Sequence, residues 1–132
     1  MKKAKLVNPK SLPKPVGFSH GVLIEGKKLL FLAGQNGANQ RSEIVSQDFA
    51  VQFEWALKNL LEVLKAAGGK PEQLGLMNIY VTDREEYGRA REAIGKVWKK
   101  LLGRHYPACA MLEVKGLWDR YAKVELEGIA VI

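Results

Sequence analysis

The sequence predicts an α+β fold in which two helices cover one face of a mixed β-sheet, in the order β-β-α-β-α-β-β. The first observation is a pair of segments, near 46–66 and 83–102, in which apolar residues recur at helical spacing on one side. The second is a set of strand-length apolar runs before, between and after these two segments. We therefore expect a four- or five-stranded sheet with both helices packed on the same face.

Size and composition indicate a globular protein. A length of 132 residues suits a single domain over 1–132, in which the lysine- and proline-rich residues 1–15 form an irregular lead-in. The net charge of +7 favours solubility and weak attraction to anions. The lone Cys109 excludes a disulfide framework within the chain and suits a reducing cytoplasm. No apolar run reaches the length of a signal peptide or a membrane span, so we expect a soluble cytoplasmic protein without metal or cofactor.

The first half of the chain predicts a hairpin followed by a helix. Residues 21–24 and 28–33 are apolar runs of strand length, and the intervening segment 25–27 supplies the turn. Residues 34–39 then predict a flexible loop at the sheet edge. The first helix is expected to begin near Ser46, because serine is a good N-cap.

The second half predicts a strand, a helix and two final strands. Residues 76–82 are rich in strand formers, and Asp83 is placed to cap the second helix, which ends at Gly103. Residues 109–114 and 121–131 supply the last two strands. In the last strand, alternation separates Ala122, Val124, Leu126 and Gly128 on one face from Lys123, Glu125 and Glu127 on the other.

The strands leave apolar side chains on both faces of the predicted sheet. The residues concerned are Leu30 and Leu32, Ile79 and Val81, and Ile129 and Val131. Because the helices are expected on one face only, the second face would expose apolar surface in a monomer. This pattern favours burial of that face by oligomerisation.

Short motifs are spread in order along nearly the whole chain. They include Pro15-Val16-Gly17-Phe18-Ser19-His20-Gly21, Ala33-Gly34-Gln35, Tyr80-Val81-Thr82-Asp83, Tyr106-Pro107-Ala108, Leu112-Glu113-Val114 and Val124-Glu125-Leu126-Glu127-Gly128-Ile129-Ala130. Each motif alone is weak, but together they resemble the RidA family, also called YjgF or the L-PSP endoribonuclease-like proteins. The resemblance implies a chorismate-mutase-like fold. It also implies a homotrimer with small-molecule clefts between neighbouring subunits.

The resemblance also implies a reaction, and two residues of this chain differ from those that the family uses for it. Studied members hydrolyse enamine and imine intermediates to a 2-oxo acid and ammonia, and an arginine two residues after the proline of the Pro-Ala pair holds the substrate carboxylate. Cys109 stands at that position here. A neutral thiol cannot form the two parallel charge-assisted hydrogen bonds that a guanidinium gives a carboxylate. We therefore expect weak or no 2-imino-acid deaminase activity. Phe18 likewise stands where those members have a tyrosine, so a hydroxyl is also missing.

Three further positions complete the candidate ligand-binding set. Gly34 matches a glycine whose backbone approaches the ligand, and Glu125 matches the glutamate that orients the attacking water, which makes it the candidate catalytic residue. Arg91 occupies a position where many members contribute an asparagine to the neighbouring subunit's cleft. The predicted site is thus lined by Phe18, Gly34, Arg91, Cys109 and Glu125, and its expected ligand resembles a 2-imino or 2-oxo acid.

Each candidate residue also has a structural interpretation. Cys109 fits a half-buried strand residue as well as a reactive thiol, and Glu127 shares the face of Glu125. His20 could serve in acid–base chemistry or only in hydrogen bonding, and His105 fits a partner of the helix C-terminus. Arg91 could pair with a nearby glutamate instead of entering a cleft; Arg120 is a weaker pocket candidate.

Two other functions stay open at the level of sequence. One is a hydrolase for a different imine-type substrate, in which Glu125 activates water. The other is an RNA-binding endoribonuclease or translation inhibitor, as older names of the family suggest. Basic residues do surround the second helix, but they lack the interleaved aromatic residues typical of an RNA-binding module.

Overall fold

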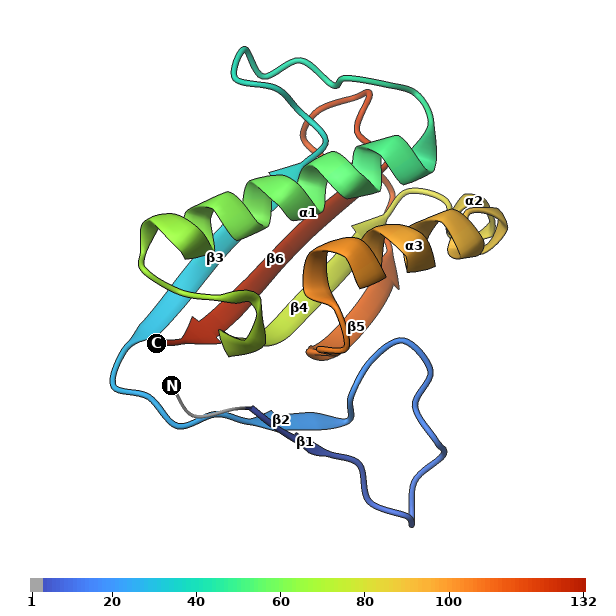
Figure 1. Ribbon diagram of the computed structural model, residues 1–132. Coiled ribbons are helices and arrows are strands. Elements are labelled where there is room, and N and C mark those ends of the chain that lie inside the picture. Colours follow the sequence, from blue (N-terminus) through green and yellow to red (C-terminus); the bar gives the residue numbers. More distant parts are fainter. Residues whose placement is uncertain (1–3) are drawn as a thin grey trace.

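The computed structural model of the protein describes residues 4–132 and confirms the α+β class (Figure 1). In chain order the elements are β1 (Lys5–Val7), β2 (Gly21–Leu23), β3 (Leu29–Asn36), α1 (Phe49–Ala66), the 3-10 helix η1 (Pro71–Gln73), β4 (Leu74–Val81), α2 (Arg84–Arg89), α3 (Arg91–Leu102), β5 (Ala108–Glu113) and β6 (Val124–Val131). Four strands form the main sheet in the order β3-β6-β4-β5. The β4–β5 pair is parallel and the other two pairs are antiparallel, so the sheet is mixed as predicted.

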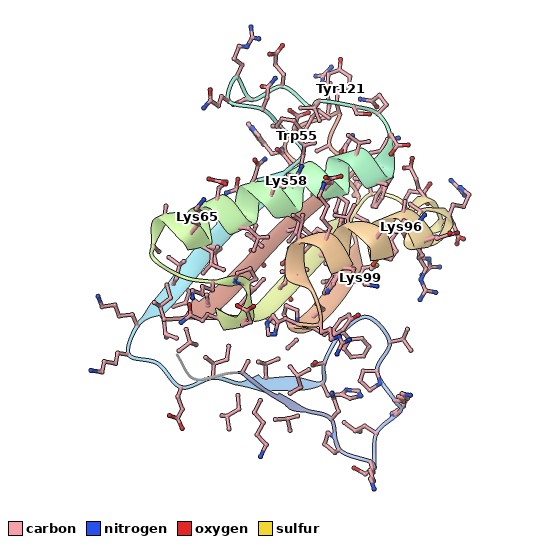
Figure 2. All side chains as sticks on the ribbon, in the orientation of Figure 1. Trp55, Lys58, Lys65, Lys96, Lys99 and Tyr121 are labelled. Carbon is pink, nitrogen blue, oxygen red and sulfur yellow. The ribbon has the colours of Figure 1, made fainter. Side chains whose placement is uncertain are left out.

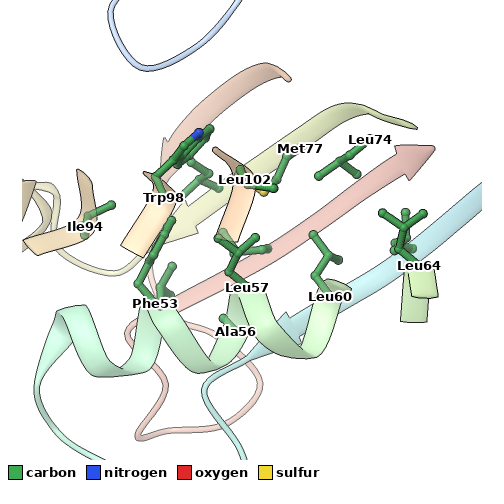
Figure 3. Close-up of a cluster of buried hydrophobic side chains, with 14 of the residues drawn as sticks. Phe53, Ala56, Leu57, Leu60, Leu64, Leu74, Met77, Ile94, Trp98 and Leu102 are labelled. Atoms are coloured by element: carbon green, nitrogen blue, oxygen red, sulfur yellow. The ribbon is translucent and has the colours of Figure 1, made fainter. Parts of the chain in front are cut away.

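Helices α1 and α3 cover one face of this sheet and enclose the core (Figure 1, Figure 3). The predicted apolar side of α1 is buried, from Phe49 and Phe53 to Leu64. Trp98 and Leu102 of α3 join it in one cluster of buried residues. The sheet contributes the following buried side chains: Leu32, Leu74, Met77, Ile79, Val81, Val124, Leu126 and Ala130.

Side-chain caps define the starts of α1 and α2, and the predicted cap of α1 is wrong. The N-cap of α1 is Asp48 and not Ser46, because the Asp48 carboxylate accepts a hydrogen bond of 3.0 Å from the Val51 amide. Ser46 instead accepts from the Asp48 amide and supports the turn before the helix. Asp83 caps α2 as predicted, accepting from the amides of Glu85 and Glu86.

The second predicted helix is divided into two. Helix α2 ends at Arg89, Ala90 takes the C-cap position with ψ near 1°, and α3 begins at Arg91. Gly103, with φ of 62°, ends α3 in the left-handed region that glycine adopts without steric cost. The break places Tyr87 in α2 and Arg91 in α3, and both residues line the cavity described below together with residues of β5.

The predicted hairpin between residues 21–24 and 28–33 is wrong. Strand β2 pairs with β1, whereas β3 pairs with the C-terminal strand β6. Strand β3 gains a long ladder and the burial of Leu32 from this pairing, which the short strand β2 cannot supply. The lead-in expected to be irregular therefore contains a strand, Lys5–Val7, and the expected loop from Gly34 begins inside β3.

The opposite face of the main sheet is not covered by a helix. The predicted alternation in β6 is confirmed, since Val124 and Leu126 are buried while Glu125 and Glu127 lie on the other face. Leu29 and Phe31 of β3 are 62% and 70% exposed on this uncovered face. Within residues 4–132, no helix is long and apolar enough to cross a membrane.

Candidate functional site

A cavity of about 660 Å³ opens at the β5 edge of the sheet, on the side covered by the helices. Helices α2 and α3 form one wall, strands β4 and β5 form the floor, and the segment 16–18 closes one end. The lining residues are Val16, Gly17, Phe18, Ile79, Tyr87, Arg91, Ile94, Gly95, Trp98, Tyr106, Cys109 and Met111. Three of the five predicted site residues, Phe18, Arg91 and Cys109, therefore meet in one place.

The N-terminal segment is fixed along the edge strand by short-range contacts. The Ser19 amide donates to the Pro107 carbonyl over 3.2 Å, and Ser19 forms a parallel bridge with Ala108. The Phe18 ring packs edge-on against His20, with centroids 5.3 Å apart. The His20 ring in turn bonds the Pro13 carbonyl at 2.8 Å, so its role is to hold this loop. These contacts carry Phe18 to the mouth of the cavity.

A stack of aromatic rings forms the inner wall. Trp98 stacks on Phe53 on one side and on Tyr106 on the other, with centroid distances of 6.5 Å and 5.8 Å. The Trp98 indole N–H donates to the His105 carbonyl at 3.1 Å, which fixes its ring plane. His105 is buried, and its Nε2 donates to the Leu74 carbonyl at 2.6 Å. His105 thus ties the end of α3 to the start of β4; the sequence had suggested only a helix-terminus contact.

Cys109 lies on the cavity floor as a neutral thiol. It pairs with Met77 across the parallel ladder and shares the face on which Met77 is buried. Burial raises the pKa of the Cys109 thiol to about 12. The sulfur lies 3.5 Å from the Pro107 carbonyl oxygen, to which the thiol donates weakly. This geometry favours the interpretation as a half-buried strand residue, because a reactive thiol needs a lowered pKa.

Arg91 is the one charged residue among the described residues that line the cavity. It occupies the first position of α3 and is exposed. None of the ion pairs found over residues 4–132 includes it, and Glu86, a partner that the sequence suggested, instead pairs with Lys123 at 2.8 Å. The pKa of the neighbouring Tyr87 hydroxyl is raised by burial, while the Arg91 charge acts in the opposite direction.

The structure places Gly34 and Glu125 together, but away from this cavity. A Cβ atom on Gly34 would lie 2.9 Å from the Glu125 side-chain Cδ, so the glycine makes room for the carboxylate. Glu125 pairs with Tyr80 across β4 and β6, on the face without helices. Within one chain, the predicted site is therefore divided between the two faces of the sheet.

The uncovered face also carries a polar cluster that the sequence did not indicate. The Tyr80 hydroxyl donates to the Glu127 carboxylate, and the Asn78 amide lies 3.4 Å from the same oxygen. The bond to Glu127 raises the pKa of Tyr80. Glu127 is thus engaged by its neighbours, whereas Glu125 makes no side-chain hydrogen bond within the described chain. This difference favours Glu125 over Glu127 as the carboxylate available to a ligand.

The basic residues outside the cavity lie on the helical layer. Lys58 and Lys65 of α1 and Lys96 and Lys99 of α3 are exposed there (Figure 2). Arg120 lies in the loop before β6 and does not line the cavity. Across residues 4–132, no group of three or more His, Cys, Asp or Glu side chains is placed to hold a metal ion.

Sequence reasoning missed several wall residues of the cavity. Tyr87, Ile94 and Trp98 lie on the apolar side predicted for the helix near 83–102 and so fitted a core role, and Tyr106 and Met111 had no predicted role in the site. A signal was present, because Tyr87, Arg91, Ile94 and Trp98 recur at helical spacing and form one stripe. An arginine within an otherwise apolar stripe indicates that this side of the helices lines a site in addition to packing in the core.

Comparison with known proteins identifies the class to which this fold and site belong. The family model described as endoribonuclease L-PSP matches residues 10–132, so the chain belongs to that family, which is also the Rid or YjgF family. The protein DfrA of Myxococcus xanthus is 31% identical over 129 residues, covering 96% of this chain and 95% of that protein. The 2-iminobutanoate/2-iminopropanoate deaminase of Rattus norvegicus is 29% identical and covers 96% of this chain and 89% of its own length.

Solved structures agree with the family assignment. A Rid-family protein of unknown function from Yersinia pestis, YyfB, superposes with a TM-score of 0.88 at 28% identity, over 99% of this chain and all of that chain. The Escherichia coli protein TdcF, solved with bound serine, gives a TM-score of 0.69 at 26% identity over 97% of this chain and 98% of its own. The resemblance to the RidA family predicted from the motifs is thereby confirmed.

Proposed function

We propose that the protein is a homotrimer that binds small carboxylate metabolites, similar to 2-imino or 2-oxo acids, in clefts between subunits. It has weak or no 2-imino-acid deaminase activity. The observation that carries the proposal is the neutral, half-buried thiol of Cys109 at the position where the resemblance places the carboxylate-binding arginine. A thiol is either neutral or an anion, so Cys109 offers a carboxylate no positive charge, and its raised pKa keeps it neutral at neutral pH.

Assembly would explain why the predicted site is divided. Phe18, Arg91 and Cys109 line the cavity on the helical face, whereas Gly34 and Glu125 lie on the uncovered face. A neighbouring subunit that packs its uncovered face against the cavity edge would complete the set of five. The exposed apolar side chains on that face, including Phe31, favour such burial. A cytoplasmic location belongs to the same proposal, since a lone free cysteine suits a reducing compartment.

The activity is tested with 2-iminobutyrate generated in situ by an amino-acid dehydratase in the presence of semicarbazide. An active deaminase consumes the imine and suppresses formation of the semicarbazone. We expect this protein to suppress it little, while the rat deaminase, assayed in parallel as a positive control, suppresses it strongly. Robust turnover by this protein would overturn the proposal of weak activity. Sedimentation velocity tests the trimer, and a monomer at micromolar concentration would contradict the inter-subunit cleft.

A second candidate function is hydrolysis of a different imine-type substrate, with Glu125 activating water. The observation that favours it is the free Glu125 carboxylate beside Gly34, since both residues match the family's pattern. Glu125→Gln should then abolish turnover of an identified substrate while binding is retained, because only the base is lost. Glu127→Gln is the matched control on the same strand face, and its turnover should persist. Equal turnover in wild type and Glu125→Gln would end this candidate.

A further inference from the structure

We infer that the cavity selects carboxylates with an aromatic or bulky apolar body, and that Arg91 and the Tyr87 hydroxyl hold the carboxylate. The inference rests on the proposed function, because it concerns the ligand of the same site. Three features carry it: the single positive charge in the lining, the aromatic walls, and the room left by a small residue at position 109.

The charge of the lining selects for an anion. Arg91 is the one charged residue among the lining side chains of the described chain, and no carboxylate of the same chain lines the cavity beside it. A guanidinium without an ion-pair partner can bind a carboxylate through two parallel hydrogen bonds. Arg91 belongs to α3, whereas position 109, where the resemblance places the family's arginine, belongs to β5. The positive charge therefore lies on a different wall of the cavity.

Tyr87 supplies a second donor next to Arg91. Its ring is held edge-on against Phe49 with centroids 5.8 Å apart, and it lines the cavity. Its hydroxyl makes no hydrogen bond to another residue over 4–132, so it is free to donate to a ligand. A tyrosine hydroxyl, with an ordinary pKa of about 10 that burial raises further here, is protonated at neutral pH, as a donor must be. Tyr87 and Arg91 together therefore form an anion-binding pair at one end of the cavity.

The remaining walls suit an apolar body. Phe18, Trp98 and Tyr106 present aromatic rings, and Ile79, Ile94 and Met111 add aliphatic surface. Trp98 is fixed by stacking and by its bond to the His105 carbonyl, so the wall is rigid before a ligand arrives. Rigid aromatic walls favour a planar ring, which can stack or pack edge-on with centroids about 4.5–7 Å apart.

The size of the cavity argues against a short-chain ligand. Its volume of about 660 Å³ lies within the range of about 300–1,000 Å³ typical of sites for drug-sized molecules. An arginine at position 109 would extend into this space from the floor, whereas the Cys109 side chain leaves it open. A short imino acid bound to Arg91 would leave most of the apolar wall in contact with water. A larger apolar acid would bury this wall, and removing apolar surface from water favours its binding.

Calorimetric titration of the full chain with matched ligands tests the inference. The probes are phenylpyruvate, 2-oxobutyrate and 2-oxo-3-phenylpropanamide, the neutral isostere of phenylpyruvate. We expect phenylpyruvate to bind at least about tenfold more tightly than either other compound, which corresponds to about 1.4 kcal/mol. Arg91→Gln should weaken phenylpyruvate binding at least tenfold. Arg89→Gln is the matched control, because Arg89 is exposed two positions earlier and does not line the cavity.

The outcomes separate this inference from the proposed function. If 2-oxobutyrate binds as tightly as phenylpyruvate and both depend on Arg91, the apolar selectivity is overturned while small-carboxylate binding stands. If phenylpyruvate binds Arg91→Gln as tightly as it binds wild type, or if 2-oxo-3-phenylpropanamide binds wild type as tightly as phenylpyruvate does, the role of the charge is overturned. Binding of no acid at all would overturn both. Cys109→Arg offers an independent test, since filling the floor should reverse the preference in favour of 2-oxobutyrate.

Discussion

Cys109 and Glu125 lie on opposite faces of the same sheet, in strands that flank β4 on its two sides. Cys109 pairs with Met77, which is buried under the helices, and Glu125 pairs with Tyr80, which points to the uncovered face. Met77 and Tyr80 are three residues apart in one strand, so their side chains have opposite directions. One chain alone therefore cannot bring the thiol position and the carboxylate to the same ligand. This separation is the structural reason to expect function at an interface between subunits.

The first prediction concerns the reactivity of Cys109. Because burial raises its pKa to about 12, alkylation by iodoacetamide at pH 8 should be about a thousandfold slower than that of a free cysteine, whose pKa is about 8.5. Mass spectrometry of the native protein over time measures the rate, and the urea-unfolded protein is the control that should react at the ordinary rate. Rapid alkylation of the native protein would contradict a buried neutral thiol.

The raised pKa of Cys109 also predicts that the free energy of unfolding falls at alkaline pH. The folded state binds the thiol proton more tightly than the unfolded chain, so this contribution is fully present below about pH 8.5. It is lost as the pH rises from there towards about 12, where the folded thiol also ionises. Urea unfolding of wild type and Cys109→Ser between pH 8 and pH 10 should show a steeper decline for wild type. Parallel curves would show that Cys109 ionises equally easily in both states.

The second prediction concerns Gln52, a fully buried polar side chain of α1. Its amide donates to the carbonyls of Ser46 and Tyr121 at 2.9 Å and 3.1 Å, and its oxygen accepts from the Lys123 amide at 2.8 Å. Gln52→Leu would leave these part-buried backbone groups without their side-chain partner, at a cost of about 3 kcal/mol for the three bonds together. Thermal unfolding should show a fall in Tm of roughly 10 °C.

The matched control for Gln52 is Gln40→Leu. Gln40 is exposed in the loop between β3 and α1, so its replacement should change the free energy of unfolding by no more than about 0.5 kcal/mol. An equally small effect for both variants would show that the three bonds of Gln52 contribute no net stability.

Local patterns predicted much of this fold because their physical causes are local. Helical spacing identified the buried side of α1, the carboxylate of Asp83 identified the start of α2, and alternation identified the faces of β6. The misplaced N-cap shows the limit of that reasoning. Ser46 and Asp48 are both good caps by residue type, but the Asp48 carboxylate accepts from the Val51 amide while Ser46 accepts from the Asp48 amide.

Long-range pairing could not be predicted in the same way. The sequence suggested that β3 would pair with β2 across a short turn, but β3 instead pairs with β6 at the far end of the chain. The cavity depends on such pairing as well, since Phe18, Arg91 and Cys109 come from three distant segments. The separation of Cys109 from Glu125 depends on the registers of two strand pairs, which no local pattern contains.

The third prediction concerns the close approach of α1 to the end of β3. A Cβ atom on Gly37 would lie 2.8 Å from the Gln52 Cα and 2.9 Å from the Gln52 carbonyl oxygen. These are backbone atoms of a packed helix that cannot move cheaply, so Gly37→Ala should destabilise the fold by about 1–3 kcal/mol. Gly88→Ala is the control, because nothing lies within 4 Å of its Cβ position in α2. Urea unfolding should show that this variant is unchanged or slightly more stable, since alanine favours helix. Equal stability of the two variants would contradict the tight contact.

The fourth prediction concerns the ion pairs that join the two covering helices. Glu54 of α1 lies 3.0 Å from Lys58 of the same helix and 3.3 Å from Lys100 of α3. The hydrogen bond to Lys58, followed by that to Lys100, lowers the pKa of Glu54. A lowered pKa means that the carboxylate stabilises the fold above the ordinary glutamate pKa of about 4.3. That contribution is lost as the pH falls through the folded-state value. Glu54→Gln should therefore cost about 0.5–1 kcal/mol at pH 7 and almost nothing near pH 2.5.

The control for this pH dependence is Glu62→Gln. Glu62 is exposed on α1 and takes part in none of the ion pairs found over residues 4–132, so its replacement should have little effect at either pH. Urea unfolding of wild type and both variants at the two pH values measures the differences, and 1 M salt should reduce the Glu54 effect by screening. A Glu54→Gln penalty that is the same at pH 7 and pH 2.5 would show that it does not arise from the carboxylate charge. In that case, the ion pairs of Glu54 with Lys58 and Lys100 would contribute no net stability to the contact between α1 and α3.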